Sequence, residues 1–324
     1  MRRRLFATLV VLLAFAISPA SAQKRIAFSF DDVPRSPGGF MTVEQRTTRL
    51  IAALRRSGIR QAAFFINPGH LLEAYGAGGE RRIRHYVRAG HVIANHSYSH
   101  ESLSEIGATA YLADIDRASR WLAGRTATRP WFRYPYLDEG TRSAVPDLSV
   151  RDAVRVGLAR RGLLNAYITV DTYDWYLDWL ASEALRAHHR LDMNALRDLY
   201  VQIVVDSAEW QDRIARETLN RQPVQVFLMH ETDLEALFLP DAVRALRAHG
   251  WEIATMDEAY RDPIASVAPE TRYLGGGRVD AIAAAAGRLP HDLIPPLNEE
   301  AEIRRLFNER VLHQPDAPAP PPPA

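Results

Sequence analysis

The stretch FSFDDVP, residues 28–34, closes a short apolar run with two adjacent aspartates. Residues Ile26–Phe30 have the apolar and aromatic composition of a buried strand. Like charges repel, and a buried carboxylate is costly unless it is paired or bound to a metal. Asp31 and Asp32 therefore need specific partners, and those partners have to come from other parts of the chain.

Short β-rich runs alternate with helical patterns along most of the chain. The expected strands are Ile26–Phe30, Ala62–Ile66, His91–Ala94, Trp131–Phe132, Ala166–Val170, Val224–Met229 and Trp251–Thr255. The expected helices are a segment opened by a capping box at Thr42–Gln45 and ended by Gly58, then Arg81–Ala89, Ala108–Ala123, Arg151–Arg161, a long stretch that includes Met193–Val204, and Asp233–Ala248. This alternation predicts an α/β fold whose parallel sheet is closed, or nearly closed, into a distorted (β/α) barrel.

The rhythm changes after Pro263, which predicts a boundary in the chain. We expect a catalytic domain over residues 23–263 and a C-terminal helical extension over 264–313, with short helices near Val279–Ala286 and Glu299–Val311. Residues 314–324 are rich in proline and predict a disordered tail.

The first 22 residues have the pattern of a secretory signal peptide. Three arginines precede the apolar run Leu5–Ile17, and small residues at Pro19–Ala22 predict cleavage near Ala22, before Gln23. The apolar run has about 13 residues, short for a membrane span of roughly 20. We therefore expect a periplasmic or secreted protein without a membrane span in the mature chain; an uncleaved anchor is the alternative.

Composition narrows the classes of function. The chain has no cysteine, which excludes disulfides and thiolate chemistry. Lys and Arg number 40 against 39 Asp and Glu, and removal of the three N-terminal arginines changes the net charge from +1 to 37 − 39 = −2. This balance argues against nucleic acid as a partner. Oligomeric state cannot be predicted from these features.

Polar residues follow five of the expected strands. These clusters are Asp31–Asp32, Asn95–His100, Arg133–Tyr136, Asp171–Trp175 and His230. Parallel α/β barrels place functional groups at the carboxyl ends of their strands, so the five clusters are expected to meet at one mouth.

The spacing of His96 and His100 indicates a metal site. On a helical turn, residues four apart share one face. Two imidazoles and one carboxylate form a three-ligand site that leaves a position open for water. The alternative for this pair is a surface or capping role, and the nearby aspartates favour the metal.

Taken together, the motifs FSFDDVP, HSYSH, RYPY, DTYDW and FLMH resemble, in this order, those of the polysaccharide deacetylases of the NodB-homology type, carbohydrate esterase family 4. The resemblance extends over about residues 25–260. It implies a distorted (β/α) barrel that removes acetyl groups from N-acetyl or O-acetyl sugars with one divalent metal ion, most often Zn²⁺.

The resemblance also implies roles for the first three motifs. Asp31 would be the general base, and Arg133 would pair with it and orient it. Asp32, His96 and His100 would bind the metal. A His/His/Asp site also accepts Co²⁺ or Ni²⁺, so the identity of the ion stays open.

The remaining roles concern the leaving group and the substrate. Tyr136 would offer its backbone N–H to the oxyanion. His230 would be the general acid, with its pKa tuned by Asp171. Trp175 and Leu228 would line the pocket for the acetyl methyl group.

Each of these residues also has a purely structural interpretation. The aspartate pair could cap a βα loop, and Arg133 could be a structural ion-pair partner. Asp171 and Asp174 could cap their loop, and Trp175 could belong to the core.

Two positions depart from the family pattern. Val33 follows the paired aspartates where family members usually have glycine, and Leu137 follows the aromatic residue of the third motif where glycine is again usual. A side chain at such a position requires an ordinary backbone conformation or accepts strain.

The leading hypothesis is a metal-dependent hydrolase acting on the acetamide of N-acetylated sugars in a peptidoglycan-like or chitin-like glycan. One alternative is hydrolysis of a non-sugar amide or of O-acetyl groups on the same fold. The other is a non-catalytic glycan-binding module.

Overall fold

A computed structural model describes residues 23–142 and 148–314 of the chain. The signal peptide expected at residues 1–22 lies outside the described residues, and so does the tail from residue 315 onward. Within the described residues, no helix is long and apolar enough to cross a membrane.

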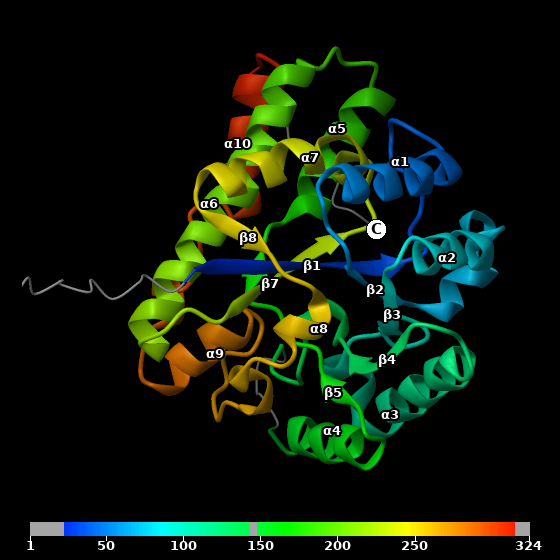
Figure 1. Ribbon diagram of the computed structural model, residues 1–324, viewed down its shortest axis with the longest axis vertical. Coiled ribbons are helices and arrows are strands. Elements are labelled where there is room, and N and C mark those ends of the chain that lie inside the picture. Colours follow the sequence, from blue (N-terminus) through cyan, green and yellow to red (C-terminus); the bar gives the residue numbers. More distant parts are fainter. Residues whose placement is uncertain (1–22, 143–147, 315–324) are drawn as a thin grey trace, which may run out of the picture.

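The centre of the fold is a curled sheet in which all paired strands are parallel (Figure 1). Its strands run in the order β5-β4-β3-β2-β1-β7-β6, and β8 pairs with β1 outside this path. The strands are β1 Lys24–Val33, β2 Ala63–Ile66, β3 Val92–Asn95, β4 Thr128–Phe132, β5 Leu164–Asn165, β6 Val170–Asp171, β7 Val224–His230 and β8 Trp251–Ile253. The predicted α/β class and parallel sheet are confirmed.

The long strand β1 organises the sheet because it pairs with three others. Its first residues pair with β8, its later residues with β2, and Arg25 to Asp31 pair along the opposite edge with β7. In this register Asp31 lies opposite His230. The two polar strand ends are therefore neighbours although 199 positions separate them in the sequence.

Alternation along β1 decides which side chains face the helices. Ile26, Phe28 and Phe30 belong to the largest hydrophobic cluster, whereas Ala27 belongs to a second cluster on the other face. Because side chains alternate along a strand, Asp31 is on the same face as Ala27, the inner face of the curled sheet.

The strand predicted over Ala166–Val170 is wrong in its extent. Leu164 and Asn165 pair with β4, whereas Val170 and Asp171 pair with β7. The residues between them cross from one side of the sheet to the other, and the Thr169 N–H donates to the Val226 carbonyl at 3.0 Å. This crossing segment spans the gap between the two outer strands of the path, β5 and β6.

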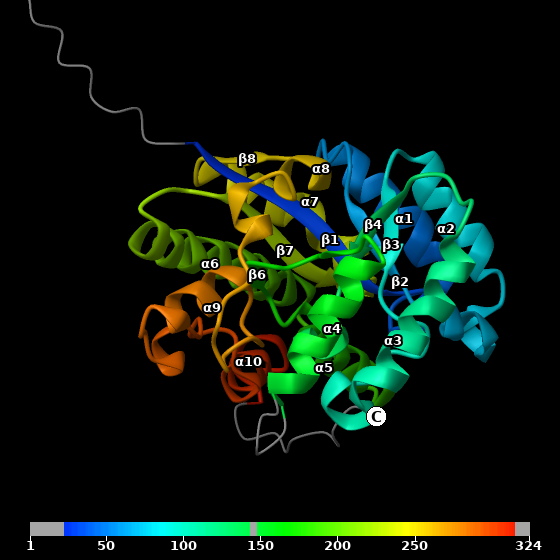
Figure 2. The same ribbon diagram turned by 90° about the horizontal axis from the view of Figure 1, so that it is seen from below.

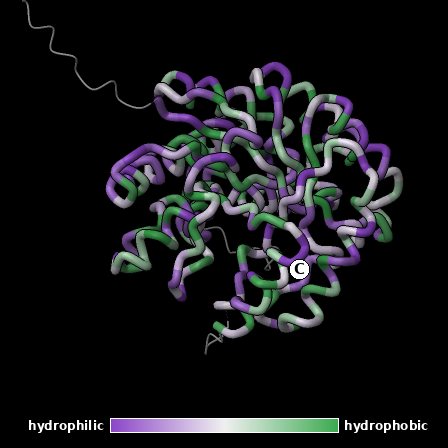
Figure 3. The backbone as a smooth tube through the Cα atoms, turned by 60° about the horizontal axis from the view of Figure 1, so that its bottom comes forward, coloured by the Kyte–Doolittle hydropathy of each residue, from purple (hydrophilic) through white to green (hydrophobic). Residues whose placement is uncertain are grey.

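Helices surround the sheet (Figures 1 and 2). They are α1 Val43–Arg56, α2 Gly79–Arg88, α3 Leu103–Leu122, α4 Leu148–Arg160, α5 Asp174–Arg186, α6 Met193–Leu219, α7 Asp233–Ala248, α8 Met256–Ala259, α9 Arg278–Ala285 and α10 Glu300–Leu306. Figure 3 shows hydrophilic and hydrophobic residues alternating along the outer helices, which is typical of helices with one buried face.

The predicted start of α1 is confirmed in detail. The Thr42 side chain accepts the Gln45 N–H, and the Gln45 side chain accepts the Thr42 N–H, which completes the capping box. Helix α5 was not predicted, although Tyr176, Leu177, Leu180, Ala181 and Ala184 repeat at helical spacing and are all buried.

The residues after Pro263 form α9, α10 and several short turns, close to the two short helices expected there. Helix α9 packs against α6, and α10 packs against α5. The Asn298 side chain donates to the main-chain carbonyl of Asp171 at 2.7 Å, so this segment supports the end of β6 directly.

Candidate active site

Three potential metal ligands meet at the carboxyl ends of β1 and β3. Asp32 Oδ1 lies 2.9 Å from His100 Nε2 and 3.4 Å from His96 Nε2. One ligand atom from each residue lies within 4.8 Å of the other two. Burial alone would raise the pKa of Asp32, but the charge of His100, the close approach of both imidazoles and the charge of Arg35 lower it well below its ordinary value.

The state of these atoms fits a bound cation. Asp32 Oδ1 and His96 Nε2 are buried and have no hydrogen-bond partner within the described residues. The other ring nitrogen of His96, Nδ1, lies 2.9 Å from the Arg133 carbonyl oxygen and donates to it. This bond leaves the Nε2 lone pair directed at Asp32, as second-shell bonds do in metal sites.

The histidines are not held by a helix, contrary to the expectation from their spacing. Ser97 and His100 both have left-handed backbone conformations, with φ of +65° and +61°. The Ser97 hydroxyl accepts the His100 N–H at 3.0 Å, which fixes the turn. A tight turn thus replaces the helical turn and places the two rings 5.0 Å apart.

Val33 adopts an ordinary backbone conformation, one of the two outcomes expected for it, and the left-handed conformation falls on the residue before it. Val33 has no left-handed conformation, whereas Asp32 has φ +64°. Non-glycine residues adopt this region rarely, and such residues cluster at functional sites. The conformation carries the Asp32 side chain toward the two imidazoles.

Asp31 is held by a buried arginine, as expected. Arg133 Nη1 lies 3.1 and 3.0 Å from the two carboxylate oxygens of Asp31, and both side chains are almost fully buried. The other guanidinium nitrogens donate to the Ser29 and Tyr260 hydroxyls and to the Ala166 carbonyl. Burial would lower the pKa of Arg133, but Asp31 and Tyr260 raise it above its ordinary value, so the guanidinium keeps its positive charge.

The expected partner of His230 is wrong: Asp174, and not Asp171, holds the imidazole. His230 Nδ1 lies 2.8 Å from Asp174 Oδ1, and the His230 N–H donates to Asp174 Oδ2 at 2.7 Å. Burial would lower the pKa of His230, but the charge and hydrogen bond of Asp174, together with the charge of Asp32, raise it above its ordinary value.

Asp171 has a different environment. It accepts the Tyr173 N–H at 3.2 Å and lines a cavity with Tyr173, Tyr273 and Asp280. Burial raises the pKa of Asp171 to about 6. The chain turns at Tyr173, where φ is +50°, so Asp174 becomes the first residue of α5 and reaches the end of β7.

Tyr136 lies close to the metal ligands. Its ring centroid is 4.6 Å from that of His100, and it belongs to a short 3₁₀ turn, Pro135–Leu137. Tyr136 and Leu137 have φ of +57° and +51°. Leu137 therefore keeps a conformation that glycine adopts without strain, so the departure from the family pattern changes the side chain and leaves a glycine-like turn.

The two pocket residues occupy different environments. Leu228 lies opposite Ser29 in the β1–β7 register, two positions before His230, so it is on the inner face below the imidazole. Trp175 is half-buried, packs on the largest core cluster and lies 5.9 Å from the Tyr173 ring. The substrate roles of both residues stay predictions.

One residue was missed by the sequence analysis. Arg35 pairs with Asp32 Oδ2, and its main-chain N–H donates to the buried Glu231 at 3.0 Å. The sequence feature that could have indicated this contact is the position of Arg35, three residues after Asp32.

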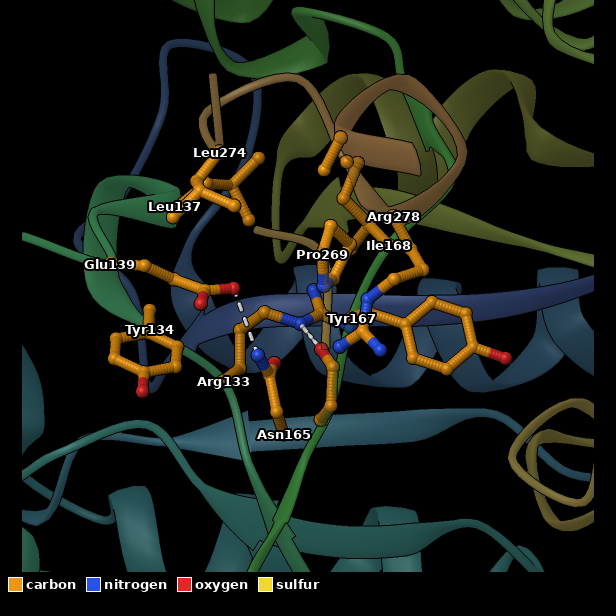
Figure 4. A pocket seen from close by; sticks show the side chains of 13 residues that line it. Arg133, Tyr134, Leu137, Glu139, Asn165, Tyr167, Ile168, Pro269, Leu274 and Arg278 are labelled. Atoms are coloured by element: carbon orange, nitrogen blue, oxygen red, sulfur yellow. Dashed lines mark hydrogen bonds between the residues drawn. The ribbon is translucent and has the colours of Figure 1, made fainter. Parts of the chain in front are cut away.

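A cavity lies behind Arg133, between the β4 loop and the C-terminal extension (Figure 4). The Asn165 side chain donates to Glu139 at 2.8 Å in its wall, and Arg278 contributes from α9. The extension therefore lines the same cavity as the arginine that holds Asp31.

These motifs agree with a comparison of the whole sequence. Residues 19–153 match the profile of the polysaccharide deacetylase family. This match covers 135 of the 324 residues of the chain. The resemblance inferred from the motifs is confirmed. The matched segment includes Asp31, Asp32, His96, His100, Arg133 and Tyr136, whereas His230 and Asp174 lie beyond it.

Solved structures of deacetylases are also similar to this chain. A family 4 carbohydrate esterase from Streptomyces lividans has 23% identity and a TM-score of 0.47, covering 74% of this chain and 97% of its own. A mutant of the peptidoglycan deacetylase PdaC from Bacillus subtilis has 17% identity and a TM-score of 0.45, covering 74% and 93%. A family 4 pseudoenzyme from Bacillus anthracis has 18% identity and a TM-score of 0.47, covering 74% and 66%. Among proteins with curated descriptions, none matches this chain.

Proposed function

We propose that this protein is a metal-dependent hydrolase that removes the acetyl group from N-acetylated sugars of a glycan. One observation carries the proposal: a base candidate and an acid candidate both lie next to the three-ligand group. Asp31 Oδ2 is 3.7 Å from His96 Nε2, and His230 Nε2 is 4.0 Å from Asp32 Oδ2.

Asp32, His96 and His100 would hold one divalent cation. An imidazole and carboxylate donor set suits Zn²⁺, and Co²⁺ or Ni²⁺ can occupy the same ligands. When bound, such an ion polarises an acyl oxygen and lowers the pKa of a water molecule toward 7.

The side chains around the ligands supply the proton transfers. Asp31 accepts the proton of the attacking water, because Arg133 holds its carboxylate in place. His230 donates a proton from Nε2 to the departing nitrogen, while Asp174 fixes the tautomer through Nδ1. A base and an acid with pKa values pushed apart are what amide hydrolysis requires.

The acyl oxygen needs a further donor as charge develops on it. The backbone N–H of Tyr136 is the candidate, since its ring already lies beside His100. A missing oxyanion donor typically costs roughly 3 kcal/mol of transition-state stabilisation.

We also propose that the protein acts in the periplasm or outside the cell, on the basis of the residue pattern at positions 1–22. An acetylated peptidoglycan-like or chitin-like glycan is the substrate class that fits both this location and the family.

Acetate release tests the proposal. Purified protein is stripped of metal, restored with Zn²⁺, Co²⁺ or Ni²⁺, and incubated with N-acetylglucosamine oligomers, peptidoglycan fragments, O-acetylated sugars and non-sugar amides. We expect release from the N-acetylated glycans only with metal restored. Release only from the O-acetylated sugars or the non-sugar amides would replace the proposed substrate class, and no release from any substrate by metal-loaded protein would overturn the catalytic assignment.

A further inference from the structure

A second carboxyl group lies directly behind the one that holds His230. Glu235, the third residue of α7, is fully buried. The Tyr200 hydroxyl, from α6, donates to Glu235 Oε2 at 2.5 Å. The side chain of Glu235 also hydrogen-bonds the side chain of Asp174.

Two carboxyl groups in hydrogen-bonding contact cannot both be anions, so one of them has to carry a proton. Both oxygens of Asp174 are occupied as acceptors, because each accepts a hydrogen bond from His230. Glu235 has no such donors: within the described residues, no Lys, Arg or His lies within 4.0 Å of its carboxyl group. The proton therefore resides on Glu235.

The two oxygens of Glu235 have different hydrogen-bond environments. Oε2 accepts from Tyr200, whereas Oε1 is buried and accepts no hydrogen bond within the described residues. An O–H group on Oε1 gives this buried oxygen a hydrogen-bond partner, because it donates to Asp174.

The charges around Glu235 also favour its protonated form. Burial, followed by the charges of Asp174 and Asp178 on α5, raises the pKa of Glu235 well above its ordinary value. The buried Arg46 on α1 lies 3.7 Å from Asp233 and 3.8 Å from Glu231, so its charge is directed at those two carboxyl groups.

We propose that Glu235 is a positioning residue, which as a neutral acid donates to Asp174 and fixes the carboxylate that orients His230. Tyr200, Glu235, Asp174 and His230 then form one chain of hydrogen bonds from α6 to the site. The inference rests on the proposed function only for the role of His230 as the general acid; the protonation of Glu235 stands independently of it.

Infrared spectroscopy tests the protonation without any turnover. The full chain, stripped of metal at neutral pH, is compared with Glu235→Gln and Tyr200→Phe. We expect a carboxylic-acid C=O band that Glu235→Gln removes and Tyr200→Phe shifts. An unchanged band in Glu235→Gln would overturn the proposal, whatever the activity of the protein.

Kinetics tests the positioning role. Glu235→Gln keeps a donor toward Asp174, and Glu235→Leu removes it at similar volume. We expect the Gln variant to stay within about threefold of the parent kcat and the Leu variant to lose about tenfold or more in kcat with KM unchanged. Equal losses in both variants would contradict positioning by a neutral donor. If the Leu variant does not fold, the infrared spectra and the kcat of the Gln variant still test the proposal.

Discussion

Asp174 holds His230 at two points, by a 2.8 Å bond to the ring Nδ1 and a 2.7 Å bond from the main-chain N–H. The second bond fixes the end of β7 as well as the imidazole. Because both bonds leave Nε2 free, the ring presents that nitrogen toward Asp32 Oδ2, 4.0 Å away. The acid candidate is thus oriented by the first residue of α5.

Replacing Asp174 should impair catalysis far more than replacing Asp171. In Asp174→Asn the amide cannot stabilise an imidazolium, so we expect kcat to fall by about 10²–10⁴-fold, the usual range for a lost acid–base contribution. Acetate release measured over a range of pH checks this. Asp171→Asn is the matched control, and a larger loss in that variant would restore Asp171 as the partner.

Metal content should depend on His100 and not on its neighbour His70. The His70 ring lies 6.2 Å from that of His100, and its Nδ1 contacts the Pro34 carbonyl oxygen at 3.1 Å, outside the ligand group. We expect His100→Ala to lower zinc affinity by about 100-fold or more, since even second-shell changes cost 10–100-fold. Elemental analysis after dialysis measures it, with His70→Ala as control. Equal zinc retention by both variants would exclude His100 as a ligand.

Parallel strands explain why most of the site could be predicted. Asp31 and His230 lie near the carboxyl ends of β1 and β7, His96 and Arg133 come directly after β3 and β4, and the parallel strands bring these positions to one edge. The apolar runs of β1 and β7 are long enough to identify from sequence.

The choice between Asp171 and Asp174 could not be made in the same way. Both lie in the motif DTYDW, and either could reach His230 from an extended loop. The outcome depends on the left-handed turn at Tyr173 and on the start of α5, which a short aromatic-rich segment does not indicate. The histidine pair shows the same limit, because a spacing of four fits a helix and also the turn built by Ser97 and His100.

Arg133 should be a major determinant of stability as well as of Asp31 geometry. In Arg133→Met the Asp31 carboxylate loses its buried partner, which typically costs about 3–5 kcal/mol. Urea unfolding of the metal-free protein measures the loss. Arg161→Ala, which removes an exposed ion pair with Asp116, is the control and should cost less than about 1 kcal/mol. A small loss in Arg133→Met would mean that the ion pair contributes little.

The buried carboxyl of Asp178 should make stability fall as pH rises from about 4 to about 6. Burial, with the nearby charge of Asp233, raises the pKa of Asp178 to about 6 from an ordinary value of 3.8. The folded state then binds more protons than the unfolded state in this window, so its stabilising contribution is complete below pH 4 and is lost as pH passes 6. Each pKa unit corresponds to 1.36 kcal/mol, which gives a contribution of about 3 kcal/mol.

Asp178→Asn keeps an acceptor for the Leu234 N–H and cannot ionise, so its free energy of unfolding should decline less over this range than that of the parent protein. Urea unfolding at several pH values checks this, with the exposed Asp198→Asn as control. Parallel pH profiles for the parent and Asp178→Asn would show that Asp178 ionises in the folded protein as it does in the unfolded chain.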